Sequence, residues 1–245
     1  MQSELQSVAA QLTRQLELDM PPVQVSYLEE APAGVTKHPG GVPSVCTFFA
    51  FGTQQAFYAG LPQHEDCEIG AFVLGAPPEG DLGRRLMATI GTMQKEGYLN
   101  PGEEAKVPHN AAPPKFVAYG PLGAFAFSPT GVLLFANPKA AMLASEAAGM
   151  GPDVWTVPMN GRPMCAILPI LNQGAPLGMS FGCIGSRRYT DLAGDKMVIG
   201  IRGDRLAEFA RRLDRIVRAN QIVEAEDAQR KASAPNAFNR PAKPN

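Results

Sequence analysis

The chain has 245 residues, of which 45% are hydrophobic and 18% charged, and this balance excludes an intrinsically disordered protein. A formal net charge of -1 argues against a general nucleic-acid binder, which normally presents a basic face. The sequence contains neither a membrane-spanning apolar run nor a secretory signal. We therefore expect a cytoplasmic protein that binds neither nucleic acid nor membranes and keeps its thiols reduced.

Hydrophobic spacing in the first half of the chain predicts helices and strands. Apolar residues at intervals of three and four predict an amphipathic helix over 5–16. Two prolines follow it, and alternating residues then predict a strand over 23–28. A second apolar stripe predicts a helix over 82–93, closed by Gly97. The continuous apolar stretch 45–51 is interpreted as a strand-like segment.

The second half follows a polar, proline-rich connector and contains most of the predicted strands. Asn137-Pro138 predicts the start of a helix that ends near Gly149, because Asn caps a helix well and Pro fits its first turn. A long helix with an arginine-rich outer face is predicted from near Asp204. The tail 231–245 is small, polar and proline-rich, which predicts disorder. Strands are predicted over 116–119, 132–136, 164–168, 179–183 and 197–201.

The two halves of the chain resemble each other weakly, as pseudo-repeats over 21–100 and 113–220. Each half carries a Pro-Pro strand start, a strand-like segment with one cysteine, and a second cysteine close to Ile-Gly. If the halves are duplicated, they form two related lobes about an approximate twofold axis. The predicted fold class is therefore α/β (α+β), with mixed sheets flanked by helices in a single globular unit over 1–230.

Four cysteines, one pair in each half, mark the candidate working site. Neither pair has the two-to-four-residue spacing of a zinc knuckle or a redox motif. If the pairs meet at a shared interface, their soft sulfur ligands favour an iron–sulfur cluster or, as an alternative, zinc. Burial as small core residues is the other interpretation. The predicted metal ligands are Cys46, Cys67, Cys165 and Cys183.

Glycines flank two of these cysteines and allow the backbone to approach a ligand closely. Gly70, Gly182 and Gly185 are therefore the predicted cofactor-binding residues. Beside them, Arg187 and Tyr189 are candidates to orient or protonate a small anionic substrate. An ordinary tight turn with a solvated arginine is the alternative.

His64 lies three residues before Cys67 and is the third candidate catalytic residue. Its place in the chain suits a fourth metal ligand, a proton shuttle or a loop residue. No phosphate-binding loop, dinucleotide fingerprint, serine-hydrolase elbow or two-histidine metalloprotease helix is found in the sequence.

Several short motifs occur in a fixed order over most of the chain. They are Pro-Pro-Val-Gln-Val (21–25), Cys46 before Phe48-Phe49, Phe57-Tyr58, His-Glu-Asp-Cys-Glu-Ile-Gly-Ala (64–71), Glu-Gly-Tyr (96–98), Asn-Pro-Lys-Ala-Ala-Met (137–142) and Gly-Cys-Ile-Gly-Ser-Arg (182–187). In these motifs the chain resembles the uncharacterised bacterial and archaeal family catalogued as domain of unknown function one hundred and sixty-nine. Ser186 departs from the pattern, in which alanine is expected. The resemblance implies a cytoplasmic prokaryotic protein and draws attention to the cysteine and glycine motifs.

Three functions from different classes follow, and whether the chain is an enzyme is left open. The leading hypothesis is a cysteine-ligated metalloprotein, with an iron–sulfur centre, that acts on or binds a small molecule. The first alternative is a metal-free protein that binds a small ligand or regulates through one. The second alternative is a thiol enzyme that uses Cys67 or Cys183, activated by His64 or by a helix N-terminus. The expected partner is a small-molecule ligand or substrate. Whether the chain forms a homo-oligomer is left open.

Overall fold

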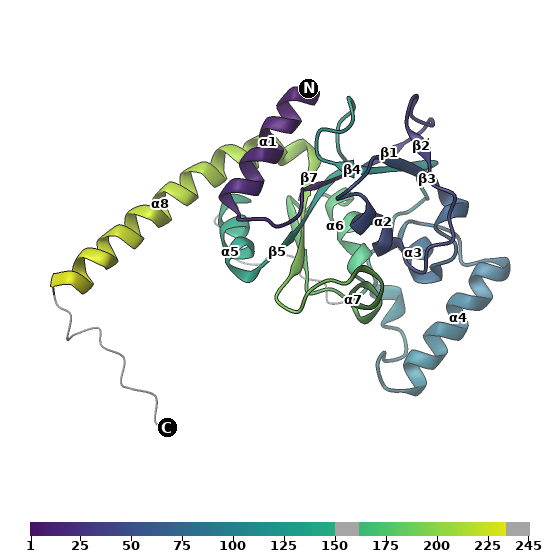
Figure 1. The fold of residues 1–245 in the computed structure, drawn as a ribbon. Helices are drawn as coiled ribbons and strands as arrows, with labels where there is room; N and C mark the ends of the chain where they lie inside the picture. The colour runs from purple at the N-terminus through teal and green to yellow at the C-terminus, as the bar shows by residue number, and fades with distance from the viewer. Residues whose placement is uncertain (150–161, 234–245) are drawn as a thin grey trace.

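The computed structural model describes residues 1–149 and 162–233, which form a mixed α/β fold around one seven-stranded sheet (Figure 1). The strand order is β2-β3-β4-β1-β5-β7-β6, and every pair is antiparallel except β2 with β3. The strands are β1 Val23–Leu28, β2 Thr36–Lys37, β3 Phe57–Gly60, β4 Phe116–Pro121, β5 Gly131–Ala136, β6 Leu177–Ser180 and β7 Met197–Arg202.

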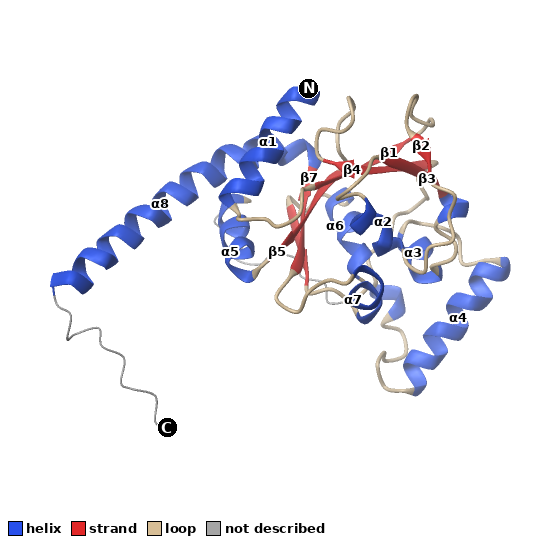
Figure 2. Cartoon of the chain, in the orientation of Figure 1, coloured by secondary structure: helices blue, strands red, loops and turns tan. Residues whose placement is uncertain are grey.

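Helices cover both faces of the sheet (Figure 2). One face packs against α2 Val45–Phe51, α3 Glu68–Val73, α6 Ile167–Asn172 and α7 Ile184–Thr190, and the other against α1 Gln2–Gln15, α5 Pro138–Ala147 and α8 Leu206–Ser233. The remaining long helix, α4 Gly80–Lys95, lies outside α3. Within the described ranges, no helix has the length and apolarity needed to cross a membrane.

The two faces carry two separate hydrophobic cores because successive side chains of a strand point to opposite sides. In β5, Leu133 and Phe135 join the core beneath α2, α3 and α6, whereas Val132 and Leu134 join the core beneath α1, α5 and α8. All six residues of β5 are buried, which explains why its sequence is continuously apolar rather than alternating.

Most predicted elements are confirmed, including the helix starts that rested on capping chemistry. The side-chain oxygen of Asn137 accepts the backbone N–H of Ala140 at 2.9 Å, so α5 begins where the sequence placed it. Gly97 follows α4 with a φ of +68°, the left-handed geometry that glycine supplies at helix ends.

Two predicted strands are wrong. Segment 45–51 is the helix α2, and segment 164–168 begins with the 3-10 helix η3 Met164–Ala166, which leads into α6. Both segments are short apolar runs that are buried on nearly all sides, so periodicity cannot distinguish a strand from a helix there. The strand predicted over 179–183 ends at Ser180. Of the tail expected to be disordered, residues 231–233 belong to α8 and the rest lie outside the described residues.

The two halves of the chain share one continuous sheet. β1 and β5 pair at its centre, Val23 opposite Leu133, and the order then runs outward through β4 and β3 on one side and through β7 and β6 on the other. The repeat in the sequence aligned β1 with β4, and these two strands are direct neighbours. The internal duplication stays a prediction.

Candidate functional site

The four cysteines meet on the sheet face that carries α2, α3, α6 and α7. Cys46 and Cys165 are buried in the core cluster of that face, and the half-buried Cys67 and Cys183 pack against it. The Cys46 thiol hydrogen-bonds with the thiols of Cys165 and Cys183, and Cys165 interacts electrostatically with Cys67. None of the four cysteines forms a disulfide. Tertiary structure therefore gathers residues from both halves of the chain into one thiol cluster.

Each half supplies its two cysteines from similar local structures. Cys46 is the second residue of α2, which precedes β3, and Cys165 is the second residue of η3, which leads through α6 to β6. Cys67 and Cys183 are the N-caps of α3 and α7. The two N-cap sulfurs accept backbone N–H groups three residues onward, from Gly70 at 3.3 Å and from Ser186 at 3.4 Å. In each half, therefore, one cysteine is deeply buried and one begins a short helix.

Cys183 is the acidic thiol of the cluster, because its pKa is lowered from 9.0 to about 5. The main cause is the hydrogen bond from the Cys46 thiol, and the backbone N–H groups of Met164 and Ser186 add to it. These hydrogen bonds favour the charged form more strongly than partial burial disfavours it. At neutral pH Cys183 is consequently a thiolate, which is the nucleophilic form of cysteine.

The other thiols that shift remain protonated. The pKa of Cys46 is raised well above its usual value, because its proton is shared with the neighbouring thiols and the side chain is buried. Burial, together with the nearby Cys165, raises the pKa of Cys67 to about 12. The cluster therefore contains one thiolate next to a buried thiol that can donate a proton to it.

The predicted cofactor-binding glycines pack closely around the N-cap cysteines. A Cβ on Gly70 would lie 2.4 Å from Cγ2 of Val45 and 2.9 Å from the Cys67 sulfur, so only glycine allows α3 to approach α2 this closely. Gly182 has a φ of +81°, and its N–H donates to the Ser180 hydroxyl at 3.1 Å. A Cβ on Gly185 would lie 3.9 Å from the Cys183 sulfur, in ordinary contact with it. These glycines shape the backbone around the sulfurs, and their role toward a cofactor stays a prediction.

Arg187 holds the loop around Cys183 together. Its guanidinium donates to the carbonyl oxygens of Ala193 at 2.9 Å, Lys196 at 3.1 Å and Leu192 at 3.3 Å, and also to that of Phe181. With its donors engaged on four carbonyls, Arg187 positions the residues on both sides of Cys183. The predicted role of Arg187 in substrate binding would require it to give up some of these bonds.

His64 is buried, with 1% of its surface exposed, and both ring nitrogens have partners. Nδ1 donates to the carbonyl of Gly60 at 2.7 Å, so Nε2 is unprotonated and accepts the Tyr119 hydroxyl at 2.9 Å. Burial lowers the pKa of His64 to about 4, so the ring is neutral at pH 7. The ring belongs to an aromatic cluster with Phe48 and Tyr119. These contacts fully account for His64 as a core histidine. Its role as a metal ligand or proton shuttle stays a prediction.

Exposed apolar side chains flank Cys183. Phe181 is 55% exposed, Ile184 73% and Tyr189 47%, although each is large and apolar or aromatic. Phe181 precedes and Ile184 follows Cys183 within two residues, and Tyr189 lies on the same short helix. The thiolate is therefore bordered by an accessible apolar rim, beside the Arg187 guanidinium that holds the loop together.

The sequence predicted that the four thiols hold a metal ion. Over the described ranges, no three or more His, Cys, Asp or Glu side chains are grouped so that they could hold a metal ion. The iron–sulfur and zinc interpretations therefore stay predictions, supported by the convergence of the four thiols and not by a ready coordination geometry.

Residues that the sequence did not single out complete the site. The N–H of Met164 supports the thiolate, and Ser186 contributes its N–H and a hydroxyl that donates to the Cys183 carbonyl at 2.8 Å. In the sequence, Ser186 stands out only as a departure from alanine, and alanine would keep the N–H and lose the hydroxyl contact. Tyr119 had no local signal, because its role depends on His64, 55 residues away.

A family model for domain of unknown function 169 (DUF169), described as uncharacterised ArCR, matches residues 11–212. The match covers all four cysteines and every strand of the sheet. No curated protein and no solved structure matches the chain.

Proposed function

We propose that this protein, which belongs to the DUF169 family, is a thiol enzyme that exchanges thiols with disulfides, with Cys183 as its nucleophile. The observation that carries the proposal is the hydrogen bond from the buried Cys46 thiol to the partly exposed Cys183 thiolate at the start of α7. A low-pKa accessible thiol paired with a buried protonated thiol is the arrangement that thiol–disulfide exchange uses.

The proposed reaction has two steps that balance in atoms and electrons. The Cys183 thiolate attacks one sulfur of a disulfide substrate, forms a mixed disulfide and releases the other sulfur as a thiolate. Cys46 then loses its proton to the released thiolate and attacks the Cys183 sulfur, which releases the second substrate thiol. The substrate gains two electrons, the chain is left with a Cys46–Cys183 disulfide, and a reducing thiol of the cell restores the two cysteines.

The structure supports distinct roles for the two cysteines. Cys183 is half-buried and bordered by the apolar side chains of Phe181 and Ile184, which suit an apolar disulfide. Cys46 is only 4% exposed, so a substrate reaches it only through Cys183. Because the pKa of Cys67 is raised to about 12, Cys67 is a poor nucleophile at pH 7.

The test is the reaction of the fully reduced protein with an aromatic disulfide that releases a coloured thiol. The wild-type chain should release two equivalents and finish with an internal disulfide. Cys46→Ser should release one equivalent and keep the reagent as a mixed disulfide, seen as added mass on the peptide containing Cys183. Cys183→Ser should lose the rapid release of the coloured thiol. Cys67→Ser, the matched control, should behave as wild type. Equal rates for wild type and Cys183→Ser would refute the proposal.

A second candidate function is a cysteine-ligated metal centre, iron–sulfur or zinc, favoured by the presence of Cys67 and Cys165 beside the reactive pair. Thiol–disulfide exchange needs only two of the four thiols, so the other two have no role in it. Iron, zinc and sulfide are measured in protein purified without oxygen, in wild type and in each single Cys→Ser variant. Stoichiometric metal that is lost in all four variants would establish this candidate in place of the thiol enzyme.

A further inference from the structure

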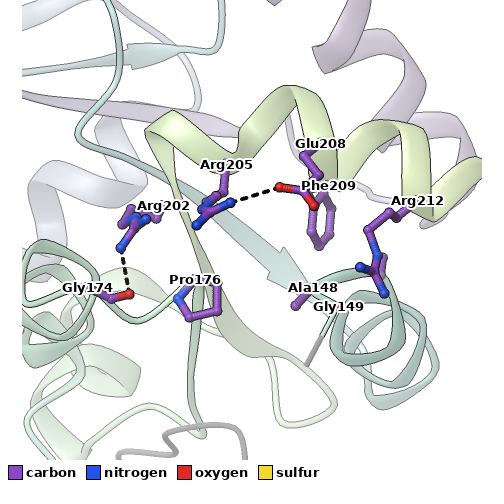
Figure 3. A pocket seen from close by; sticks show the side chains of 10 residues that line it. Ala148, Gly149, Gly174, Pro176, Arg202, Arg205, Glu208, Phe209 and Arg212 are labelled. Carbon is purple, nitrogen blue, oxygen red and sulfur yellow. Dashed lines mark hydrogen bonds and ion pairs between the residues drawn. The ribbon is translucent and has the colours of Figure 1, made fainter. Parts of the chain in front are cut away.

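A small cavity lined by arginines lies where α8 begins. It has a volume of about 170 Å³ and is enclosed by the end of α5, the turn between α6 and β6, the last residue of β7 and the first turns of α8 (Figure 3). Cys183 follows the end of β6, whereas this cavity adjoins the start of that strand. The cavity is therefore separate from the thiol cluster.

Three guanidinium groups line the cavity, and they differ in how they are held. Arg202 donates to the carbonyl of Gly174 and to Asp204, each at 2.6 Å. Arg205 pairs with Glu208 at 3.0 Å. These contacts fix two of the three cationic groups at the cavity wall before any ligand arrives.

Arg212 is the cationic group left available. In the described part of the chain it makes no hydrogen bond or ion pair, although it is partly buried. Its side chain lies against Gly149, where a Cβ would come within 2.0 Å of Nη1 and where φ is +64°. The absence of a side chain at Gly149 therefore makes the room that the Arg212 guanidinium occupies beside the cavity (Figure 3).

The charge of the lining selects the class of ligand. The three guanidiniums meet two carboxylates, Asp204 on Arg202 and Glu208 on Arg205, so among the described residues the charge of Arg212 is left uncompensated, and the N-terminus of the 28-residue helix α8 adds a partial positive charge. Guanidinium forks match the oxygens of phosphate and carboxylate groups. The volume lies below the roughly 300 Å³ at which drug-sized ligand pockets begin, so the ligand group is small.

We propose that this cavity binds a small oxyanion, a phosphate or carboxylate group, with Arg212 as its principal ligand and Arg202 and Arg205 as supporting cations. The inference is independent of the thiol chemistry, because neither the residues nor the cavity overlap.

The test is titration of the full chain with inorganic phosphate and, separately, with malonate, by calorimetry at constant ionic strength in chloride. Arg212→Gln should weaken binding about tenfold or more, as expected for loss of a hydrogen-bonded charge. Arg212→Lys keeps the charge without the fork and should fall between that variant and wild type. The matched control, Arg211→Gln, removes the same charge from an exposed neighbour on α8 and should bind as wild type.

Tighter binding of phosphate than of malonate identifies a phosphate group as the ligand, and the reverse order identifies a carboxylate. Thermal melts of each variant show whether it is folded. The proposal is overturned if folded wild type binds neither anion, or if Arg211→Gln weakens binding as much as Arg212→Gln, since general charge screening would then explain the effect.

Discussion

Removal of the Cys46 thiol should raise the pH at which Cys183 ionises. The hydrogen bond from Cys46 is the largest cause of the lowered Cys183 pKa, which is about 5. A hydrogen bond to a charged group contributes about 1.5–3 kcal/mol, so its loss in Cys46→Ala should raise the midpoint by about one to two pH units. The N–H groups of Met164 and Ser186 remain in that variant and together oppose the burial that raises the pKa, so the midpoint should stay below 9.0. Cys46→Ser keeps a donor and should shift the midpoint less.

The assay is the alkylation rate of Cys183 as a function of pH, with mass spectrometry of the peptide that contains it. A pH scan is required because the rate at pH 7 is a poor measure: a higher pKa lowers the thiolate fraction but makes the thiolate more nucleophilic. Cys67, whose pKa is about 12, and the buried Cys46 contribute little to alkylation at low pH.

Cys67→Ala is the matched control, because it removes another thiol of the cluster that is neither among the causes of the Cys183 shift nor among those of the Cys46 shift. Its midpoint should stay close to that of wild type. A wild-type midpoint near 9, or a midpoint that Cys46→Ala leaves unchanged in a folded protein, would refute the reasoning.

Three further predictions concern stability and are measured by urea unfolding. Below pH 6.5 the unfolded chain protonates His64, whereas the folded chain does so only near pH 4. About 3 kcal/mol of unfolding free energy should therefore be lost as the pH falls from 6.5 to 4. The variant His64→Gln should lose less stability over the same pH range. Gly70→Ala should lower the free energy of unfolding by about 1–3 kcal/mol through overpacking. In the matched control, Gly91→Ala in α4, the added Cβ meets nothing within 4 Å and should stabilise the chain slightly. Arg187→Gln should lower the free energy of unfolding by about 2 kcal/mol, because the guanidinium contacts with carbonyl oxygens are lost. The matched control, Arg188→Gln at an exposed position, should lower it by less than about 0.5 kcal/mol. Equal losses in the two variants would contradict the role assigned to Arg187.

Local patterns predicted the elements whose residues obey a clear period or cap. The helices α1, α4, α5 and α8 and the strands β1, β4, β5 and β7 lie where the sequence placed them, within a few residues. Amphipathic spacing and capping act over a few residues, so a single sequence contains that information. The short apolar segments around Cys46 and Cys165 carry no such period, and only their packing against the sheet decides that they are helical.

The sequence by itself also identified the four cysteines as a candidate site, because their paired placement and glycine flanks are visible without a structure. Which of them has a lowered pKa was decided by tertiary structure alone. Cys67 and Cys183 have nearly the same local setting, each as the N-cap of a short helix with one N–H donor three residues onward. Their pKa values nevertheless move in opposite directions. Burial dominates at Cys67, whereas Cys183 accepts a hydrogen bond from the Cys46 thiol in the other half of the chain. An interaction between residues so distant in sequence leaves no mark on the sequence around either of them, and it exists only once the sheet brings the two halves together.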